Sequence, residues 1–325
     1  MKKLLIGFIS FFLDKILFII FIPVSLLLKL FLRFGPRRMK YSTILFRFFG
    51  VFPIDDHYYS PLFNYKHLKN PLNKNRQLPG IVFDLQKQKG EISKFNYSQE
   101  LTELKLELPS VKNNNFDINN GGYGPGDADF LYNFVRYFKP KKIIEIGSGN
   151  STKIVNLAIK QNLQETSSGQ SISHTCIEPY EMPWLDKFDV NLIRKKVEDC
   201  DIDLFKTLNA GDFLFIDSSH IIRPQGDVLF EYQNILPILR KGVFIHIHDI
   251  FSPKDYLEDW IKKDVKLWNE QYLLESLLTH SNRFKIKFSL NHFKHEYFDI
   301  LKSVCPYLKK DSEPGSMYIE VVNEN

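Results

Sequence analysis

The sequence predicts an α/β protein with a doubly wound, mostly parallel sheet of seven strands, preceded by an N-terminal apolar helical segment. Three observations lead to this prediction. From residue 126 onward, short apolar runs alternate with amphipathic stretches of helical length. A Gly-x-Gly turn joins the first of these runs to the helix that follows it. Several of the runs end on an acidic residue or a histidine, which is expected where parallel strands hold a ligand at their carboxyl ends.

The regular part of the chain, residues 126–325, begins with a helix. Asp127 is a suitable N-cap, Phe130, Phe134 and Phe138 recur at helical spacing, and Pro140 ends the pattern. Seven strands are expected after it, namely IIEIG, HTCIEP, VNLIRKK, DFLFIDS, GVFIHIHDI, RFKIKFSL and SMYIEVV. Further helices are expected after the first strand, over GDVLFEYQNILPIL, and between Trp260 and Leu278. Residues 41–125 are read as an irregular lead-in to this domain.

Residues 1–40 form an apolar segment that we expect to associate with a membrane. Residues 4–32 are interrupted only by Asp14, Lys15 and Lys29, and the part from 16 to 32 has the length of a short membrane span. An in-plane helix on the cytoplasmic leaflet is the alternative. A cleaved signal peptide fits poorly because the apolar region is long and no small-residue cleavage site follows it. Four cations directly after the apolar run 4–32 favour a cytoplasmic location for the rest of the chain, namely Arg33, Arg37, Arg38 and Lys40.

Charge and cysteine content argue against two other classes of protein. Of the formal net charge of +5, residues 1–40 contribute +7, from eight Lys/Arg and one Asp, so the remaining residues carry −2. A nucleic-acid-binding protein would carry its positive charge on the folded domain, and no nucleic acid is expected as a partner. The three cysteines, Cys176, Cys200 and Cys305, are widely spaced and lack a zinc-binding pattern. They favour a reducing compartment.

Polar residues end or follow five of the predicted strands, where a ligand site is expected. Because the carboxyl ends of parallel strands meet at one edge of the sheet, we expect these residues to lie together. In chain order they are Glu145 with Gly147 and Gly149, then Glu178, Glu198 with Asp199, Asp217, and His248 with Asp249.

The turn at Gly147 fits a cationic ligand better than a dinucleotide. A dinucleotide motif has a third glycine three residues after the second, and here that position is Thr152. Glu178 also lies further along the chain than the acid that usually binds a dinucleotide ribose. Glu145 beside the turn would repel a pyrophosphate but would attract a ligand with an ammonium group and a sulfonium centre. A nicotinamide oxidoreductase is therefore the less favoured alternative.

The segment EIGSGNST resembles motif I of class I S-adenosylmethionine-dependent methyltransferases, and CIEP resembles the acidic end of their second strand. More specifically, the chain is similar to a bacterial branch of small-molecule O-methyltransferase-like proteins. The segments that carry this resemblance lie in the expected order over about residues 50–322: HYYSPLFN, DADFLY, EIGSGNST, FIDSSH, GDVLFEYQNILPILRKGVFIHIHDIFSP and WNEQYLLESLL. The N-terminal apolar segment lies outside the common pattern.

The resemblance implies S-adenosyl-L-methionine as cofactor and assigns residues to it. Glu145, Gly147 and Gly149 would bind its methionine part, with Ser151 or Thr152 capping the next helix and reaching the same end. Glu178 would accept hydrogen bonds from both ribose hydroxyls, for which two carboxylate oxygens are suited. The adenine would be lined by residues 197–199, which include Glu198 and Asp199.

Two devices could take the proton from an acceptor hydroxyl. In the first, His220 or His248 is the general base, because an unperturbed histidine has a pKa of about 6.5. In the second, Asp217 and Asp249, with or without His220, bind a divalent cation such as Mg²⁺ that acidifies the hydroxyl. Relatives with a metal often have acid-Asn at the end of strand five, where this chain has His248-Asp249. Both devices therefore stay open.

Two further assignments concern aromatic and histidine side chains near the predicted site. His246 shares a strand face with His248 but lies deeper, so we expect it to be a hydrogen-bonded core residue. The aromatic cluster at 57–61, together with Tyr123, could cover an acceptor or pack the lead-in onto the sheet.

The sequence thus predicts a membrane-associated methyltransferase that acts from the cytoplasmic side on a small-molecule, sugar or lipid-linked glycan hydroxyl. A non-catalytic binding or scaffolding protein on the same core is the rival interpretation. The retained acids, Glu145 and Glu178, argue against it.

Overall fold

The computed structural model describes residues 2–165, 171–180 and 182–323. These residues form two compact units, 1–69 and 70–325. The boundary falls inside the predicted lead-in, because residues 70–125 pack into the second unit. Its helices α3 (Leu85–Ile92) and α4 (Ser98–Leu104) place Ile92 and Leu101 in the same core cluster as the sheet.

The first unit consists of helix α1 (Lys2–Phe34), helix α2 (Lys40–Phe49) and the short turn Tyr65–His67. The predicted apolar segment is one continuous helix, which Asp14, Lys15 and Pro23 do not interrupt. Within the described residues, Ile6–Phe34 is the one stretch long and apolar enough to cross a membrane, by length and composition only. Almost none of that stretch is buried.

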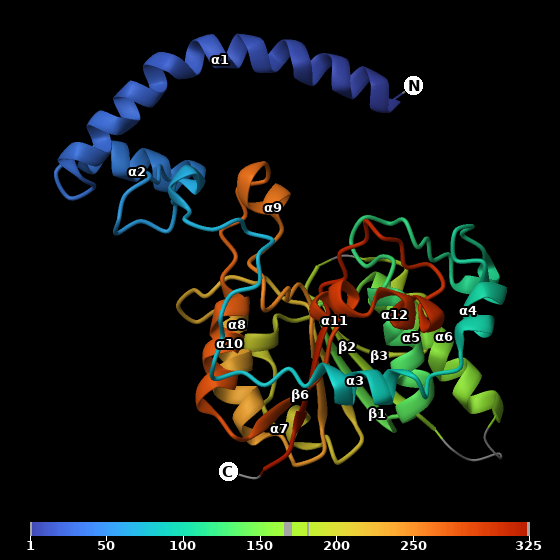
Figure 1. Cartoon of the computed structure of the whole chain (residues 1–325). Coiled ribbons are helices and arrows are strands. Elements are labelled where there is room, and N and C mark those ends of the chain that lie inside the picture. Colours follow the sequence, from blue (N-terminus) through green and yellow to red (C-terminus); the bar gives the residue numbers. More distant parts are fainter. Residues whose placement is uncertain (1, 166–170, 181, 324–325) are drawn as a thin grey trace. The chain divides into compact units, whose positions relative to one another are not determined.

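The second unit contains the predicted seven-stranded sheet, in the order β3-β2-β1-β4-β5-β7-β6 (Figure 1). β7 runs antiparallel to both of its neighbours, β5 and β6, and the other strand pairs are parallel. The sheet is therefore mostly parallel, as predicted. Its strands are β1 (Lys142–Ile146), β2 (Ser173–Ile177), β3 (Asn191–Ile193), β4 (Phe213–Ile216), β5 (Phe244–Ile247), β6 (Phe284–Ser289) and β7 (Met317–Val321).

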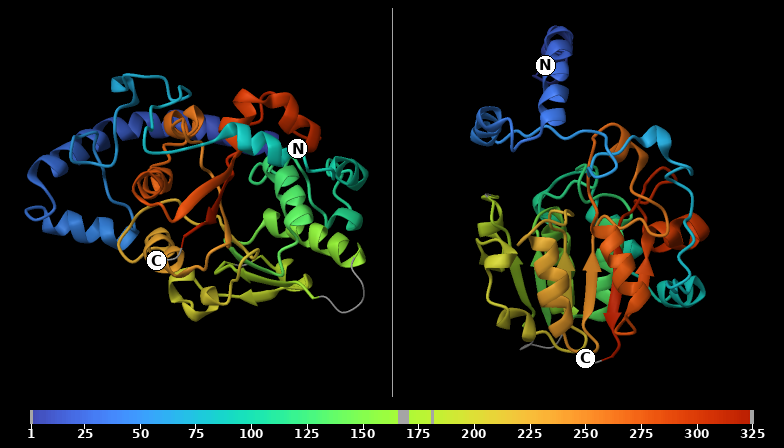
Figure 2. Two further views of the ribbon diagram at one scale, coloured as in Figure 1. Left: turned by 60° about the horizontal axis from the view of Figure 1, so that its bottom comes forward. Right: turned by 90° about the vertical axis from the view of Figure 1, so that its left-hand side faces the viewer.

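Helices cover both faces of the sheet (Figure 2). Two hydrophobic clusters fill the spaces between the helices and the sheet. Side chains alternate along each strand, so in β1 Ile143 faces one cluster while Ile144 and Ile146 face the other. The first face is covered by α5 (Asp127–Phe138), α6 (Asn150–Glu165), α11 (Leu290–Glu296) and α12 (Phe298–Val304). On the second face lie α7 (Asp203–Lys206), α8 (Asp227–Phe230) and α10 (Glu270–His280).

The predicted helix between Trp260 and Leu278 is divided in the structure. Helix α9 (Glu258–Lys262) contains Trp260 and ends at Lys262, and α10 begins only at Glu270. Between them Val265 has a φ of 54°, which a continuous right-handed helix does not permit. The ammonium group of Lys266 lies over the rings of both Trp260 and Trp268, 3.7 and 3.9 Å from their centroids. This interruption brings Glu270 to the edge of the sheet, where the candidate site lies.

Candidate functional site

A pocket of about 240 Å³ opens at the carboxyl ends of the parallel strands. The segments after β1, β2, β3 and β4 line it. Its charged lining residues are four acids and two cations, namely Glu178, Glu198, Asp217 and Asp227 with Lys196 and Arg223. This excess of negative charge is what a cationic ligand requires.

Gly147 allows the turn after β1 to lie directly against the end of β4. Its φ is +78°, and a Cβ atom there would lie 1.8 Å from the carbonyl oxygen of Asp217. Its N–H donates to the carbonyl of Ile177 at 3.0 Å, which ties the turn to β2 as well. A side chain at this position would therefore push the turn away from β2 and β4. Gly147 itself lines the pocket. Gly149 has open space around it and does not line the pocket.

Glu178 lines the pocket as predicted, directly after β2. Its Oε1 atom accepts a hydrogen bond of 2.9 Å from the backbone N–H of Tyr180. Burial raises the pKa of Glu178, although this hydrogen bond and Arg194 oppose the shift. Glu198 lines the same pocket, whereas Asp199 lines a separate hollow that Glu198 shares. The structure therefore brings Glu178, Glu198 and Asp217 together and leaves Asp199 beside them.

Glu145 does not reach this pocket, and its predicted contact with a ligand needs correction. Its side chain is fully buried on the sheet face covered by α6. The carboxylate accepts hydrogen bonds from Ser151 at 2.5 Å and Thr152 at 2.8 Å, and lies 3.0 Å from Nε2 of His174 and 3.6 Å from Sγ of Cys176. Ser151 and Thr152, also assigned to the cofactor, are engaged here instead. Because the side chains of β1 alternate, Glu145 points away from the face of Ile146, which lines the pocket. The carboxylate thus fixes the start of α6 to β2.

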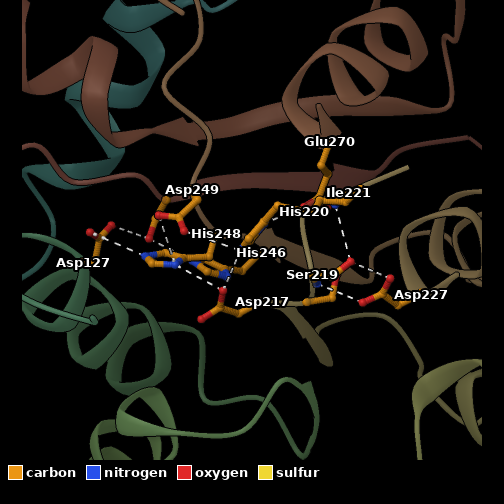
Figure 3. A network of polar contacts seen from close by, with 12 residues as sticks. Asp127, Asp217, Ser219, His220, Ile221, Asp227, His246, His248, Asp249 and Glu270 are labelled. Carbon is orange, nitrogen blue, oxygen red and sulfur yellow. Dashed lines mark hydrogen bonds and ion pairs between the residues drawn. The ribbon is translucent and has the colours of Figure 1, made fainter. Parts of the chain in front are cut away.

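Asp217 joins the pocket to a cluster of histidines and acids (Figure 3). Nε2 of His220 lies 3.2 Å and Nδ1 of His248 lies 3.4 Å from its Oδ1 atom. Asp249 completes the cluster at 3.4 Å from His220 and 3.5 Å from His248. His220 and Asp249 both have positive φ angles, 60° and 57°, which are uncommon for residues other than glycine and concentrate at functional sites. Among the four catalytic or metal candidates, Asp217 and Asp249 thus each contact both His220 and His248.

His220 is held between carboxylates on both sides of its ring. Its Nδ1 atom lies 2.8 Å from Glu270, on the opposite side from Asp217 and Asp249. Burial lowers the pKa of His220, but hydrogen bonds and charges from Asp217 and Glu270 outweigh it and raise the pKa to about 10. The expectation of a histidine with an ordinary pKa is therefore wrong for His220. Both of its ring nitrogens face acids, which suits a residue that orients its neighbours.

His248 is the candidate whose ring nitrogens are least satisfied. Both nitrogens are buried, and neither makes a hydrogen bond of good geometry within the described residues. Burial lowers its pKa, but Asp249 and Asp217 outweigh this and raise the pKa well above the ordinary value. One ligand atom each from Asp217, His248 and Asp249 lie within 4.8 Å of one another. Two carboxylates and an unsatisfied imidazole are a donor set that fits a divalent cation.

His246 is a core residue, as predicted. It is fully buried, its ring stacks on Phe215 with centroids 4.2 Å apart, and its Nε2 lies 2.8 Å from the hydroxyl of Ser316. Burial lowers its pKa well below the ordinary value. Tyr123 is also buried, with its ring centroid 4.9 Å from that of His248, which agrees with the packing role rather than with a lid. Tyr58 of the aromatic cluster 57–61 is exposed.

Two acids of the site were not predicted as site residues. Glu270 is in the first turn of α10, where an acid is ordinarily explained by the helix dipole. Asp127 was expected to cap α5, but Gly126 is the N-cap and its N–H donates to Asp129 at 2.9 Å. The Asp127 carboxylate accepts from the N–H of Gly315 at 3.1 Å and lies 3.7 Å from Nε2 of His248. No local pattern distinguishes either acid from an ordinary helix-start residue.

Comparison with known proteins matches part of the second unit to a recognised domain type. A family model described as a methyltransferase domain matches residues 144–250. An uncharacterised protein of Archaeoglobus fulgidus is 27% identical over 176 residues, which cover 50% of this chain and 75% of that protein.

Similar solved structures include two enzymes. An O-methyltransferase from Bacillus cereus in complex with SAH is 15% identical, with a TM-score of 0.41 over 71% of this chain and 99% of that one. The O-methyltransferase TomG of Streptomyces achromogenes, involved in tomaymycin synthesis and in complex with SAM, is 11% identical, with a TM-score of 0.36 over 73% of this chain and 90% of that one.

Proposed function

We propose that this chain, whose residues 144–250 match a methyltransferase domain model, methylates a hydroxyl group of a small molecule, sugar or lipid-linked glycan at the cytoplasmic face of a membrane. One observation carries the proposal. The carboxylate of Asp217 lines the pocket and also contacts both His220 and His248. A ligand that fills the pocket therefore ends beside a cluster able to bind a hydroxyl.

S-adenosylmethionine is the methyl donor of this domain class, and when bound it presents an electrophilic methyl group on a sulfonium. The residues that line the pocket suit such a ligand. Glu178 can accept hydrogen bonds from two ribose hydroxyls, and Val197 and Glu198 offer an apolar and a polar wall for the adenine. Gly147 lets the backbone approach the methionine part. Glu145 would contribute only by holding α6 in place.

The acceptor hydroxyl would bind to the cluster at the edge of β4 and β5. Asp217, His248 and Asp249 would hold a divalent cation, which lowers the pKa of a bound hydroxyl. His220 would act as a positioning residue, because Glu270 holds one side of its ring and the other faces Asp217 and Asp249. Methyl transfer is an in-line displacement, so orientation of the hydroxyl is the main contribution expected of these side chains.

The presence of the apolar helix α1 favours an acceptor that is itself a component of the membrane. A lipid-borne acceptor and a membrane-anchored enzyme diffuse in the same plane, which raises the effective concentration of the acceptor at the enzyme. A chain without residues 1–40 should retain transfer to a soluble acceptor and lose transfer to the native acceptor in membranes. Binding of S-adenosylmethionine would first show that the shortened chain is folded. Undiminished transfer to the native acceptor in membranes would show that α1 does not contribute to substrate access.

The function is tested by calorimetry followed by product identification. Titration with S-adenosylmethionine should show binding to one site, and NAD should show none. Incubation with methyl-labelled cofactor and membrane extract should then label one product, and a chelator should abolish the labelling if the cation is required. Binding without any labelled product would favour the scaffolding alternative, and an absence of binding would overturn the proposal.

A further inference from the structure

Helix α2 presents an apolar face that nothing in the described structure covers. Its residues Tyr41, Ile44, Leu45, Phe48 and Phe49 follow the i, i+3, i+4, i+7, i+8 spacing of a single helix face. Their side chains are between 54% and 91% exposed, and no residue of α2 is buried. Two phenylalanines, a tyrosine and two aliphatic residues on one face are unusual for a surface helix in water.

The opposite side of α2 is fixed to α1. Phe46 packs edge-on against Phe31 with ring centroids 5.0 Å apart, and Phe52 contacts both rings at 6.2 and 5.9 Å. Phe31 is almost completely buried by these contacts. The helix ends at Gly50, whose φ of 66° lets its N–H donate to the carbonyl of Arg47. The packing of Phe46 therefore fixes the rotation of α2 about its own axis, and this rotation leaves the apolar face exposed.

The connection between the two helices is held by hydrogen bonds of its own. The N–H of Gly35 donates to the carbonyl of Phe31 at 2.8 Å, and the hydroxyl of Thr43 donates to the carbonyl of Pro36 at 3.0 Å. The orientation of α2 relative to α1 is thus built into the first unit.

Positive charge surrounds the apolar face. Five cations lie between residues 33 and 47, and no acid occurs from residue 33 to residue 54; the cations are Arg33, Arg37, Arg38, Lys40 and Arg47. At 100° per residue, Lys40 and Arg47 lie on the side of α2 away from the middle of its apolar face. This combination of aromatic residues on one face and cations on the other is typical of helices that lie in a membrane interface.

We infer that α2 is an in-plane membrane helix that binds the surface of an anionic phospholipid bilayer. The side chains of Ile44, Phe48 and Tyr41 enter the boundary between headgroups and acyl chains, and the cations contact lipid phosphates. The apolar helix α1, which runs directly into this connection, places α2 at the level of the headgroups. This inference concerns a site that methyl transfer does not use, and it holds whether or not the proposed activity does.

The test uses the full chain reconstituted in vesicles of phosphatidylcholine and phosphatidylglycerol. A tryptophan is introduced on the apolar face by Phe48→Trp. The control is Val111→Trp, at an exposed site of the second unit, which leaves α2 and all five cations unchanged. The emission of the native Trp184, Trp260 and Trp268 is measured in the parent chain and subtracted. Acyl-chain-brominated lipids should quench the tryptophan at position 48 about twofold or more strongly than that at position 111.

A second arm removes the anionic lipid. In vesicles of phosphatidylcholine alone, the preference for position 48 should shrink, because the cations lose their partners. Equal quenching at both positions in anionic vesicles would overturn the inference. So would an unquenched tryptophan at position 48 together with cross-linked dimers, since that result would assign the face to a second copy of the chain.

Discussion

The Nδ1 atom of His220 lies 2.8 Å from the carboxylate of Glu270, although the two residues are 50 positions apart in the chain. The carbonyl of His220 also accepts hydrogen bonds from the N–H groups of Asn269 and Glu270, at 3.0 and 3.2 Å. The loop after β4 is thereby joined to the first turn of α10 through both side chain and backbone. This contact leaves only the Nε2 side of the ring to face Asp217.

We expect Glu270→Gln to reduce methyl transfer by about tenfold or more while the affinity for S-adenosylmethionine stays within about twofold. The amide keeps the shape and one acceptor oxygen but removes the charge that faces the imidazole. Single-turnover kinetics and calorimetry separate the two quantities. Glu275→Gln on the same helix would be a poor control because Glu275 pairs with Arg76, so the exposed Glu258→Gln on α9 serves instead. An equal loss of transfer in Glu258→Gln would contradict the positioning role.

Glu178→Gln should weaken binding of S-adenosylmethionine by about tenfold to a hundredfold, because a carboxamide has one acceptor oxygen where two are needed for the ribose. The melting temperature should change little, since the side chain faces the pocket. Calorimetric titration measures the first quantity and thermal unfolding the second. Unchanged affinity would remove Glu178 from the proposed cofactor site.

Glu145→Gln should show the opposite pattern. Replacing a buried carboxylate that meets Ser151, Thr152, His174 and Cys176 leaves donors facing an amide N–H, at a cost of about 2–4 kcal/mol in the free energy of unfolding. Cofactor affinity of the folded fraction should stay within a few-fold. A stable Glu145→Gln protein that no longer binds S-adenosylmethionine would restore the direct contact predicted from the sequence.

Asp249→Asn should raise the Mg²⁺ concentration needed for half-maximal transfer by about tenfold or more, because the amide is a weaker cation ligand than a carboxylate. Glu198→Gln is the matched control, since Glu198 lines the pocket but lies outside the cluster around His248. Glu198→Gln should lower the affinity for the cofactor and leave the Mg²⁺ dependence unaltered. Activity that is insensitive both to chelators and to Asp249→Asn would exclude the cation device.

Glu313 provides a pH-dependent contribution to stability outside the site. Burial raises its pKa, but His295, Asn291 and Lys294 outweigh this and lower the pKa to about 2. The stabilisation is fully present above the unfolded pKa of about 4.5 and is lost as the pH falls through the folded value near 2. Glu313→Gln should therefore cost about 1–2 kcal/mol at pH 7, after allowance for the partly exposed side chain, and progressively less toward pH 3.

Denaturant unfolding of both proteins in detergent at pH 7, 4 and 3 measures this difference. The exposed Glu296→Gln, on the same helix α11 as Lys294, should change stability by less than about 0.5 kcal/mol at each pH. A difference for Glu313→Gln that is constant from pH 7 to pH 3 would show that packing, rather than charge, is responsible.

The order of strands and helices could be predicted from the sequence because periodicity is a local property. The seven apolar runs became the seven strands, and the residues after the second and fourth of them, Glu178 and Asp217, share a pocket. The prediction was less successful where a contact depends on the sheet face on which a side chain lies. Glu145 lies in β1, two residues before Gly147, yet its side chain lies on the face covered by α6, away from the pocket.

Local sequence patterns were therefore enough to predict the class of sheet, the glycine turn and the acids at the strand ends. Which side chains meet follows from tertiary packing, because a contact such as that between His220 and Glu270 depends on how α10 packs onto the sheet after the helical segment is interrupted at Val265. The same contact sets the charge around His220. A pKa is fixed by neighbours in space, and those neighbours come from segments that no local pattern connects.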